Sequence, residues 1–378
     1  MNILIKDIIY KNNYYCKKYI NNYKKVEQLI CADIKTKNVE KLYVDNIISK
    51  INTLEIDVFV DKDDDIVVKK NIHIFDTIKE IYDKIIDDNK NKLDYLLSLE
   101  QPAQRTKEWY DIRNNMLTAS DLGKIIKDSR PGTKNTILLK KCGYNSDVKL
   151  TGKALTWGVK YEQVANDIYS SRNDIKVYEF GLIQHPTISH FGASPDGISE
   201  DLVMLEIKCP YSREINGTIP DDYYAQIQGQ LEVCDLENCD YLECKLIEYS
   251  DYESFLNDIV KNKEEGNEYG VIIEIFDIKE HCVKYKYSSL CPTVDELHIW
   301  RNSIMDTIID DDNLEYNTIY YWKCDIYSCT RVIRDKIWFN NIRGKLDAFW
   351  EEVLYYRKNI DLLDTLISKK QKDKKLNI

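Results

Sequence analysis

The sequence predicts an α/β protein in which a central mixed β-sheet carries helices on both faces and mainly helical segments extend both ends. Short apolar runs alternating with polar residues indicate strands in the middle of the chain, and stretches with helical apolar spacing surround them. The 378 residues suffice for a large core and for two or three domains. We expect an accessory N-terminal domain over residues 1–100, a core over 101–290 and a mainly helical C-terminal extension over 291–378.

Composition limits the classes of protein that this chain can form. Its 53 Lys and Arg residues against 64 Asp and Glu residues give a net charge of −11, which argues against a protein that coats DNA nonspecifically. The eleven cysteines form no C-x-x-C pair, so a zinc or iron–sulfur site is not expected. Lys6 and Lys11 interrupt the first apolar stretch, and no uncharged apolar run approaches membrane-spanning length. We expect a soluble intracellular protein with reduced thiols.

Residues 1–100 carry no recognisable chemical motif. Apolar spacing predicts helices over residues 3–30 and 76–99, and alternation predicts a hairpin formed by residues 54–60 and 66–75. The role of this part is therefore left open.

A break at Pro102 separates this part from the core. A helix is predicted over residues 108–115, and Thr118 or Ser120 is well placed to cap the next helix. Arg113 beside a capped helix N-terminus would make a phosphate seat, because a guanidinium fork and free backbone N–H groups both bind anions. From these residues alone, an ordinary helix-turn-helix corner with a surface arginine is the better explanation.

The stretch 149–172 predicts a long helix that begins after Gly152. Glu162 lies beside its apolar stripe, so it is either a surface glutamate or, if the helix packs against the sheet, a ligand for a metal ion. Residues 176–185 read as a strand leading into the next motif. The stripe consists of Trp157, Tyr161, Val164, Ala165 and Ile168.

Residues 191–210 are the most informative stretch, because they read as two short strands joined by a polar turn. Residues two apart on a strand point to the same face, so Glu206 and Lys208 project together. A tight hairpin can bring Asp196 beside them. Carboxylate oxygens bind Mg²⁺ or Mn²⁺, such an ion activates water and offsets phosphate charge, and a nearby lysine can orient the attacking water.

This arrangement is the PD-(D/E)xK pattern of metal-dependent phosphodiester hydrolysis. A short Glu-x-Lys string alone is weak evidence, since Glu243-Cys244-Lys245 repeats it. Only the first string follows a Pro-Asp-Gly turn within a near-continuous apolar run, as a buried central strand should. We interpret the second string as part of a structural strand.

Downstream, a polar loop contains Arg213, and residues 223–234 predict a helix with Gln226 and Gln230 on one side. A glutamine amide there could reach the attacking water or a phosphate. Strands are expected at residues 240–249, 268–277 and 281–288. The last ninety residues read as mainly helical, with their tryptophans in the core.

Several motifs recur in the order typical of one family. They are E-W-x-x-R with T-A-S, then KALTWGVKYE, SPDG, LEIKCP and AQIQ, over about residues 104–250. In these motifs the chain resembles the lambda-exonuclease and YqaJ-type viral recombinase family. The resemblance implies a restriction-endonuclease-like core and a nuclease that digests duplex DNA from a 5′ end, leaving a 3′ overhang for recombination or repair.

The resemblance also assigns roles to individual residues. Glu162, Asp196 and Glu206 match the metal-binding carboxylates, and the carbonyl of Ile207 matches a further ligand. Lys208 matches the catalytic lysine and Gln226 the first glutamine of the A-Q-x-Q motif. The residues matching those that bind the terminal 5′-phosphate are Arg113, Ser120 and Ser194, with Arg213 in a loop one residue shorter than the family's.

The implied cofactor is Mg²⁺ or Mn²⁺, and the implied partners are DNA duplex ends and a single-strand annealing protein, with no membrane. Large DNA viruses encode relatives of this kind, which implies the host cytoplasm, a viral factory or the nucleus. The segments before residue 104 and after residue 290 depart from the compact phage enzyme and leave a homo-oligomer open. Two alternatives are a structure- or sequence-specific endonuclease on the same core and a non-catalytic DNA-end-binding protein.

Overall fold

The computed structural model describes residues 87–126, 133–144, 152–261, 266–363 and 365. The chain divides into two compact units, residues 1–95 and 96–378. The predicted helix over residues 3–30 and the predicted hairpin lie outside the described residues. Within the predicted helix 76–99, the described part is helical over residues 87–98. None of the described helices is both long and apolar enough to cross a membrane.

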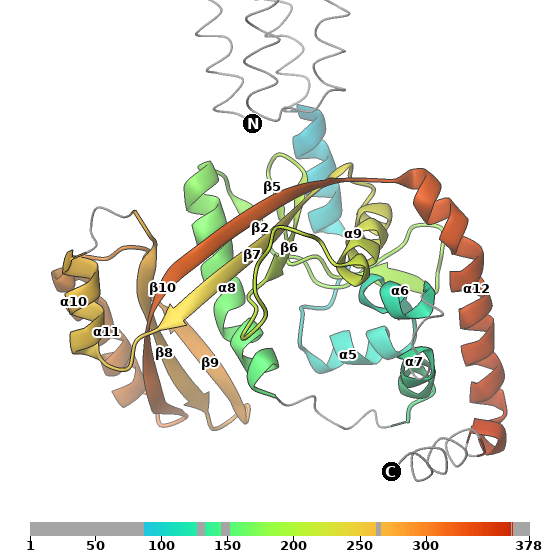
Figure 1. Ribbon diagram of the computed structural model, residues 1–378. Coiled ribbons are helices and arrows are strands. Elements are labelled where there is room, and N and C mark those ends of the chain that lie inside the picture. The colour runs from blue at the N-terminus through green and yellow to red at the C-terminus, as the bar shows by residue number, and fades with distance from the viewer. Residues whose placement is uncertain (1–86, 127–132, 145–151, 262–265, 364, 366–378) are drawn as a thin grey trace, which may run out of the picture. The chain divides into compact units, whose positions relative to one another are not determined.

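The second unit is built around a seven-stranded mixed sheet with the order β2-β5-β6-β7-β10-β8-β9 (Figure 1). Only β6 and β7 run parallel, and every other neighbouring pair in this sheet is antiparallel. The expected α/β class is confirmed. The strands are β2 (Val177–Tyr178), β5 (Gly197–Ser199), β6 (Val203–Lys208), β7 (Asn238–Glu248), β8 (Tyr269–Asp277), β9 (Cys282–Tyr287) and β10 (Leu314–Ile333).

A second, three-stranded sheet has the order β1-β4-β3, with β1 at Leu117–Thr118, β3 at Ile183–Gln184 and β4 at Phe191–Ala193. The single strand expected over residues 176–185 is therefore wrong, because its two ends, β2 and β3, belong to different sheets. The chain between them passes close to Pro102, where a Cβ on Gly181 would lie 2.1 Å from the Pro102 carbonyl oxygen.

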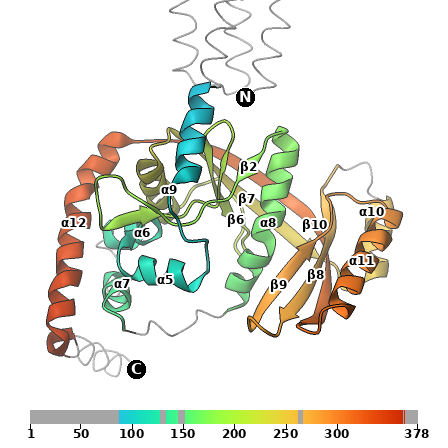
Figure 2. The same cartoon turned by 180° about the vertical axis from the view of Figure 1, so that it is seen from behind.

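Eight helices, α5 to α12, lie within the described residues of the second unit. Figure 2 shows α8 along the large sheet, α10 and α11 beside β8, and α5, α6, α7 and α12 at the opposite end. The face toward α8 holds a core of apolar side chains from α8 and the sheet, including Tyr161, Ile168, Leu205, Leu242 and Trp322. The helices are α5 (Lys107–Asn114), α6 (Ala119–Ile126), α7 (Thr133–Lys141), α8 (Lys153–Asn173), α9 (Asp221–Cys234), α10 (Tyr252–Lys261), α11 (Val294–Ile309) and α12 (Lys336–Lys358).

The strand β10 was not expected, because its polar and aromatic residues gave no clear period of two. Its first half pairs with β8 and its second half with β7, with register shifts near Asn317 and Asp325. Figure 1 shows it crossing from the end that carries α10 and α11 to the start of α12. Residues 291–378 thus complete the sheet as well as supplying helices, and Trp322 is buried on a strand rather than on a helix.

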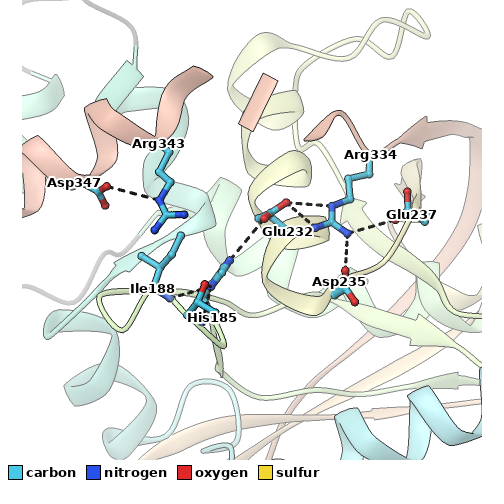
Figure 3. A network of polar contacts seen from close by, with 9 residues as sticks. His185, Ile188, Glu232, Asp235, Glu237, Arg334, Arg343 and Asp347 are labelled. Carbon is cyan, nitrogen blue, oxygen red and sulfur yellow. Dashed lines mark hydrogen bonds and ion pairs between the residues drawn. The ribbon is translucent and has the colours of Figure 1, made fainter. Parts of the chain in front are cut away.

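A network of polar contacts joins the chain between β10 and α12 to α9 and β3 (Figure 3). Arg334 binds Glu232 at 2.7 Å and Asp235 at 2.8 Å. His185 Nδ1 accepts hydrogen bonds from the backbone N–H of Thr187 and of Ile188, and its Nε2 lies 3.8 Å from a Glu232 oxygen. The start of α12 is thereby tied to the helix α9, which borders the candidate site.

Candidate active site

Strand β6 positions Glu206 and Lys208 by simple alternation. Leu205 and Ile207 pack into the core with α8, so Glu206 and Lys208 project from the other face. The Glu206 side chain is fully buried, and its Oε1 forms an ion pair with Lys208 Nζ. The predicted pairing of these two side chains on one face is therefore present.

The buried carboxylate of Glu206 has a second partner on α9. Gln230 Nε2 donates to Glu206 Oε2 at 2.8 Å. Gln226, the glutamine singled out by the motif, lies one turn earlier and is half-buried. Gln228 instead donates to the Ile333 carbonyl and accepts from the Asp335 N–H, so it fastens α9 to the start of α12. In the sequence, the position of Gln230 on the same helix face as Gln226 was the signal that pointed to it.

Asp196 lies beside β6, as the predicted hairpin required. Its Oδ2 accepts a hydrogen bond of 2.7 Å from the backbone N–H of Ile207. The hairpin itself is formed by β5 and β6, because the preceding strand β4 belongs to the smaller sheet. Asp196 occupies the short connection between the two sheets.

Glu162 reaches this region from α8. Its Oε2 lies 2.6 Å from a guanidinium nitrogen of Arg105, a residue to which the sequence gave no role. We call Glu162, Asp196 and Glu206, together with Lys208, the carboxylate cluster.

Charges within the carboxylate cluster act on one another. Burial, followed by the charge of Glu206, raises the pKa of Asp196 well above its ordinary value, although Lys208 opposes this shift. Burial also raises the pKa of Glu162, against the opposing effects of Arg105 and Lys208. Burial alone would lower the pKa of Lys208, but Glu206 and Asp196 outweigh it and raise that pKa. The cluster therefore holds a permanent ammonium among carboxyl groups that repel each other.

The donor chemistry of the cluster suits a hard divalent cation, because carboxylate oxygens are the ligands that Mg²⁺ and Mn²⁺ prefer and a cation would relieve their repulsion. Within the described residues, no group of three His, Cys, Asp or Glu side chains is arranged to hold a metal ion. Arg105 and Lys208 occupy oxygens of Glu162 and Glu206. Joint coordination thus requires these side chains to rearrange.

A second cluster forms where α5 meets α6. An Arg113 guanidinium nitrogen lies 3.0 Å from Ser120 Oγ and 3.5 Å from Thr118 Oγ1. The guanidinium stacks over the Trp109 ring at 4.2 Å, and Trp109 Nε1 donates to Ser194 Oγ at 3.0 Å. Through Trp109, the three predicted residues Arg113, Ser120 and Ser194 belong to one group. We call Trp109, Arg113, Thr118, Ser120 and Ser194 the arginine cluster.

Charged side chains next to the arginine cluster fix the ends of its helices. Lys141 Nζ donates to the Arg113 carbonyl at 2.7 Å and pairs with Asp121 at 3.0 Å. Arg357 on α12 donates to the carbonyl oxygens of Asn114 and Lys141, at the ends of α5 and α7. Burial lowers the pKa of Arg113, while Asp121 opposes that shift. Such a preformed cationic group with hydroxyl neighbours can bind a phosphate.

The two clusters are joined through three consecutive residues. Ser194 belongs to the arginine cluster and Asp196 to the carboxylate cluster, and only Pro195 separates them. Gln230 links them again, because its Nε2 contacts both Glu206 and, at 3.4 Å, the Ser194 carbonyl. An anion seat and a group of acidic side chains therefore adjoin each other.

Arg213 has a different environment from Arg113. Its guanidinium pairs with Glu243 on β7, whose side chain is only 1% exposed and also accepts a hydrogen bond of 2.9 Å from Tyr241. The second Glu-x-Lys string is thus part of a structural strand, as interpreted from its sequence. Arg213 anchors its loop to the sheet through this contact.

Comparisons with known proteins agree with the motif resemblance. Residues 108–237 match the model of the YqaJ-like viral recombinase domain, which confirms the resemblance over that part. The chain is also 34% identical over 343 residues to the uncharacterized protein R354 of Acanthamoeba polyphaga mimivirus. That alignment covers 81% of this chain and 62% of the mimivirus protein, so the chain spans less than two thirds of its relative.

Solved structures show more distant likeness. An alkaline exonuclease, LHK-Exo, from Laribacter hongkongensis matches 69% of this chain and 100% of its own, with 19% identity and a TM-score of 0.43. A phage related exonuclease from Haemophilus somnus 129PT matches 67% of this chain and 99% of its own, with 12% identity and a TM-score of 0.39.

Proposed function

We propose that this protein is a metal-dependent DNA exonuclease that degrades duplex DNA from 5′ ends and leaves 3′ overhangs for recombination or repair. The observation that carries the proposal is the junction of the two clusters through Ser194 and Asp196. A terminal phosphate held at one cluster would place a nearby phosphodiester at the other. The match of residues 108–237 to a recombinase domain supports the same reaction.

In this proposal Asp196, Glu206, Glu162 and the Ile207 carbonyl hold Mg²⁺ or Mn²⁺. The bound ion would supply an activated water and charge neutralisation at the phosphate. Gln230 and Lys208 both contact Glu206, so they orient its carboxylate. Lys208 keeps its proton and can stabilise charge that builds on the phosphate oxygens.

At the arginine cluster, Arg113 would bind the terminal 5′-phosphate, with hydroxyl donors from Ser120 and Ser194. Stacking on Trp109 fixes the plane of the guanidinium, which favours a bidentate contact. Gln226 lies one turn before Gln230 on α9, and its amide would contact the attacking water or a phosphate. Arg213, whose side chain is 38% exposed beside Glu243, would contact DNA outside the terminal-phosphate seat.

The broader setting of the reaction follows from the same resemblance. A mimivirus relative supports a place inside the infected host cell. A single-strand annealing partner and a homo-oligomer remain predictions.

The direct test uses end-labelled linear duplexes with Mg²⁺, carrying either a 5′-phosphate or a 5′-hydroxyl. We expect label at the 5′ end to be released first, and faster from the phosphorylated substrate. Arg113→Ala should reduce this preference while 5′-hydroxyl ends are cut at an unchanged rate. Cleavage of covalently closed circular duplex at a similar rate would show an endonuclease instead, and no nucleotide release from any substrate would refute a nuclease.

A further inference from the structure

The segment before α5 holds Arg105 in an unusual backbone conformation. Its φ is +67°, in the left-handed region that residues with a Cβ rarely adopt. Both neighbours are fixed. Gln104 Nε2 donates to the carbonyl oxygens of Phe180 and Pro195 at 2.9 and 3.0 Å, and Thr106 caps α5 by accepting from the Trp109 N–H. The fold therefore imposes this conformation on Arg105 from both sides.

Stability does not explain an arginine at this position. Glycine adopts a positive φ without steric cost, so it would suit the backbone better. The ion pair between Arg105 and Glu162 involves side chains that are 45% and 32% exposed. Exposed ion pairs contribute little to folding. Residues that keep a strained backbone without a structural benefit concentrate at functional sites.

The position of Arg105 connects the two clusters. Gln104, its neighbour, binds the carbonyl of Pro195, which lies between Ser194 and Asp196. Its own guanidinium contacts Glu162 of the carboxylate cluster. Trp109 of the arginine cluster follows four residues later, at the capped start of α5. A guanidinium at this point lies beside the path that a DNA strand would take from one cluster to the other.

We propose that Arg105 is a phosphate-binding residue of the DNA path. When DNA and a divalent ion bind, its guanidinium leaves Glu162 and takes up the backbone phosphate nearest the carboxylate cluster, which also frees a Glu162 oxygen for the ion. A planar fork of N–H donors suits a phosphate as well as it suits a carboxylate. This inference rests on the proposed nuclease function.

The test measures equilibrium binding of a 5′-phosphorylated duplex at several salt concentrations. Every variant carries Lys208→Ala, so that DNA is consumed far more slowly than it binds, and the parent carries only this change. We expect Arg105→Gly to bind less tightly and to lower the magnitude of the slope of log K against log salt by about 0.9, the loss of one phosphate contact. Arg105→Lys should keep the slope because it keeps the charge.

Two further measurements distinguish a DNA-binding role of Arg105 from a structural one: the unfolding temperature of the variant, and the salt slope of a control arginine variant. Arg105→Gly should unfold at the same temperature as the parent or a higher one, because glycine relieves the positive φ. The control is Arg172→Ala on α8. This change removes an ion pair in which Arg172 Nε lies 2.6 Å from a Glu268 oxygen, and it should leave the salt slope unchanged. Tighter Mn²⁺ binding by Arg105→Gly without DNA would further support release of Glu162.

Two results would overturn the inference. One is an unchanged affinity and salt slope in Arg105→Gly while the parent binds DNA, which would leave the nuclease proposal intact. The other is weaker binding that parallels a lower unfolding temperature, which would mark Arg105 as structural. If the parent binds no duplex and the unmodified protein releases no nucleotides, the proposed function fails, and this inference fails with it.

Discussion

Two lysines on adjacent strands provide a matched pair at the scale of single residues. Lys208 and Lys245 each end a Glu-x-Lys string, but only Lys208 pairs with a fully buried glutamate and lies 5.1 Å over the Tyr223 ring. Lys208→Ala should reduce DNA hydrolysis by about 10²-fold or more, because it removes a positioned positive charge. The measurement is nucleotide release from a linear duplex.

Lys245→Ala is the control and should keep nearly full activity. Asp196→Asn and Glu206→Gln should abolish release while far-ultraviolet circular dichroism stays unchanged. Equal loss of activity in the two lysine variants would show that neither string is specific to the reaction.

Asp121 is a buried carboxylate whose partner is also buried. Burial alone would raise the pKa of Asp121, but Lys141 and a hydrogen bond from Thr118 lower it below its ordinary value. Asp121→Asn should therefore destabilise the fold by about 3–5 kcal/mol, because Lys141 would remain charged and unpaired in the interior. Urea denaturation measures this change. Asp312 is exposed, so Asp312→Asn should shift stability by less than about 0.5 kcal/mol.

His185 should make stability depend on pH. Its Nδ1 already accepts two backbone hydrogen bonds, and burial lowers its pKa despite the opposing charge of Glu232. His185 thus binds fewer protons in the folded protein than in the unfolded chain, where a histidine has a pKa of about 6.5. The contribution of His185 is complete above that pH and is lost as pH falls toward the lowered pKa.

Unfolding temperatures between pH 8 and pH 5 should show this loss, and His185→Gln should have a flatter profile over the same range. Profiles of identical shape in the two proteins would exclude His185 as the source. A steeper fall in the variant would indicate that the neutral imidazole is not the form that the fold prefers.

At the scale of elements, two helical glycines occupy different surroundings. A Cβ on Gly229 of α9 would lie 3.1 Å from the Ala119 Cβ and 3.2 Å from the Phe191 ring, where α6 and α9 approach closely. A Cβ on Gly158 of α8 would meet nothing within 4 Å. Both changes to alanine gain similar helix propensity, but only the Gly229 methyl group would be crowded. Gly229→Ala should therefore be less stable than Gly158→Ala by about 1–3 kcal/mol.

Thermal and urea unfolding of the two variants test this difference. Gly158→Ala should exceed the unmodified protein in stability by about 0.5–1 kcal/mol. Equal stabilisation by both changes would show that α6 and α9 have room to separate, so that the packing around Gly229 does not fix the distance between these two helices.

At the scale of the whole molecule, β10 holds the large sheet together. It lies between β7 and β8, so the strands β8 and β9 reach the rest of the sheet only through it. A chain that ends after residue 312 lacks β10 and α12. We expect it to lose the cooperative unfolding transition, although every residue of the carboxylate and arginine clusters remains.

A chain that ends after Thr365 retains all helices and strands with assigned bounds and is the control. It should unfold cooperatively, with a midpoint close to that of the full chain. A cooperative transition in the shorter chain would instead show that residues 1–312 fold cooperatively without β10 and α12.

Local patterns were sufficient for much of the candidate site. Alternation along β6 placed Glu206 and Lys208 on one face, and helical spacing put Glu162 beside the buried stripe of α8. The same reasoning missed Arg105, because an ion pair across 57 positions leaves no periodic trace. Spacing placed Gln226 and Gln230 on one helix face without choosing between them, and the motif resemblance favoured Gln226; two such glutamines are distinguished only by what packs against each turn.

Periodicity and turn chemistry act over neighbouring residues, so they predicted the class of fold, most of the core's helices and strands, and Glu206 and Lys208 on one face of a strand. The residues of the arginine cluster were predicted through the motif resemblance. Strand pairing, the place of β10 in the sheet and the contacts of Arg105 and Lys208 with oxygens of Glu162 and Glu206 became visible only in the folded chain. These features depend on contacts between residues far apart along the chain. Their energies arise from packing and charge once the chain has folded, so no local pattern records them.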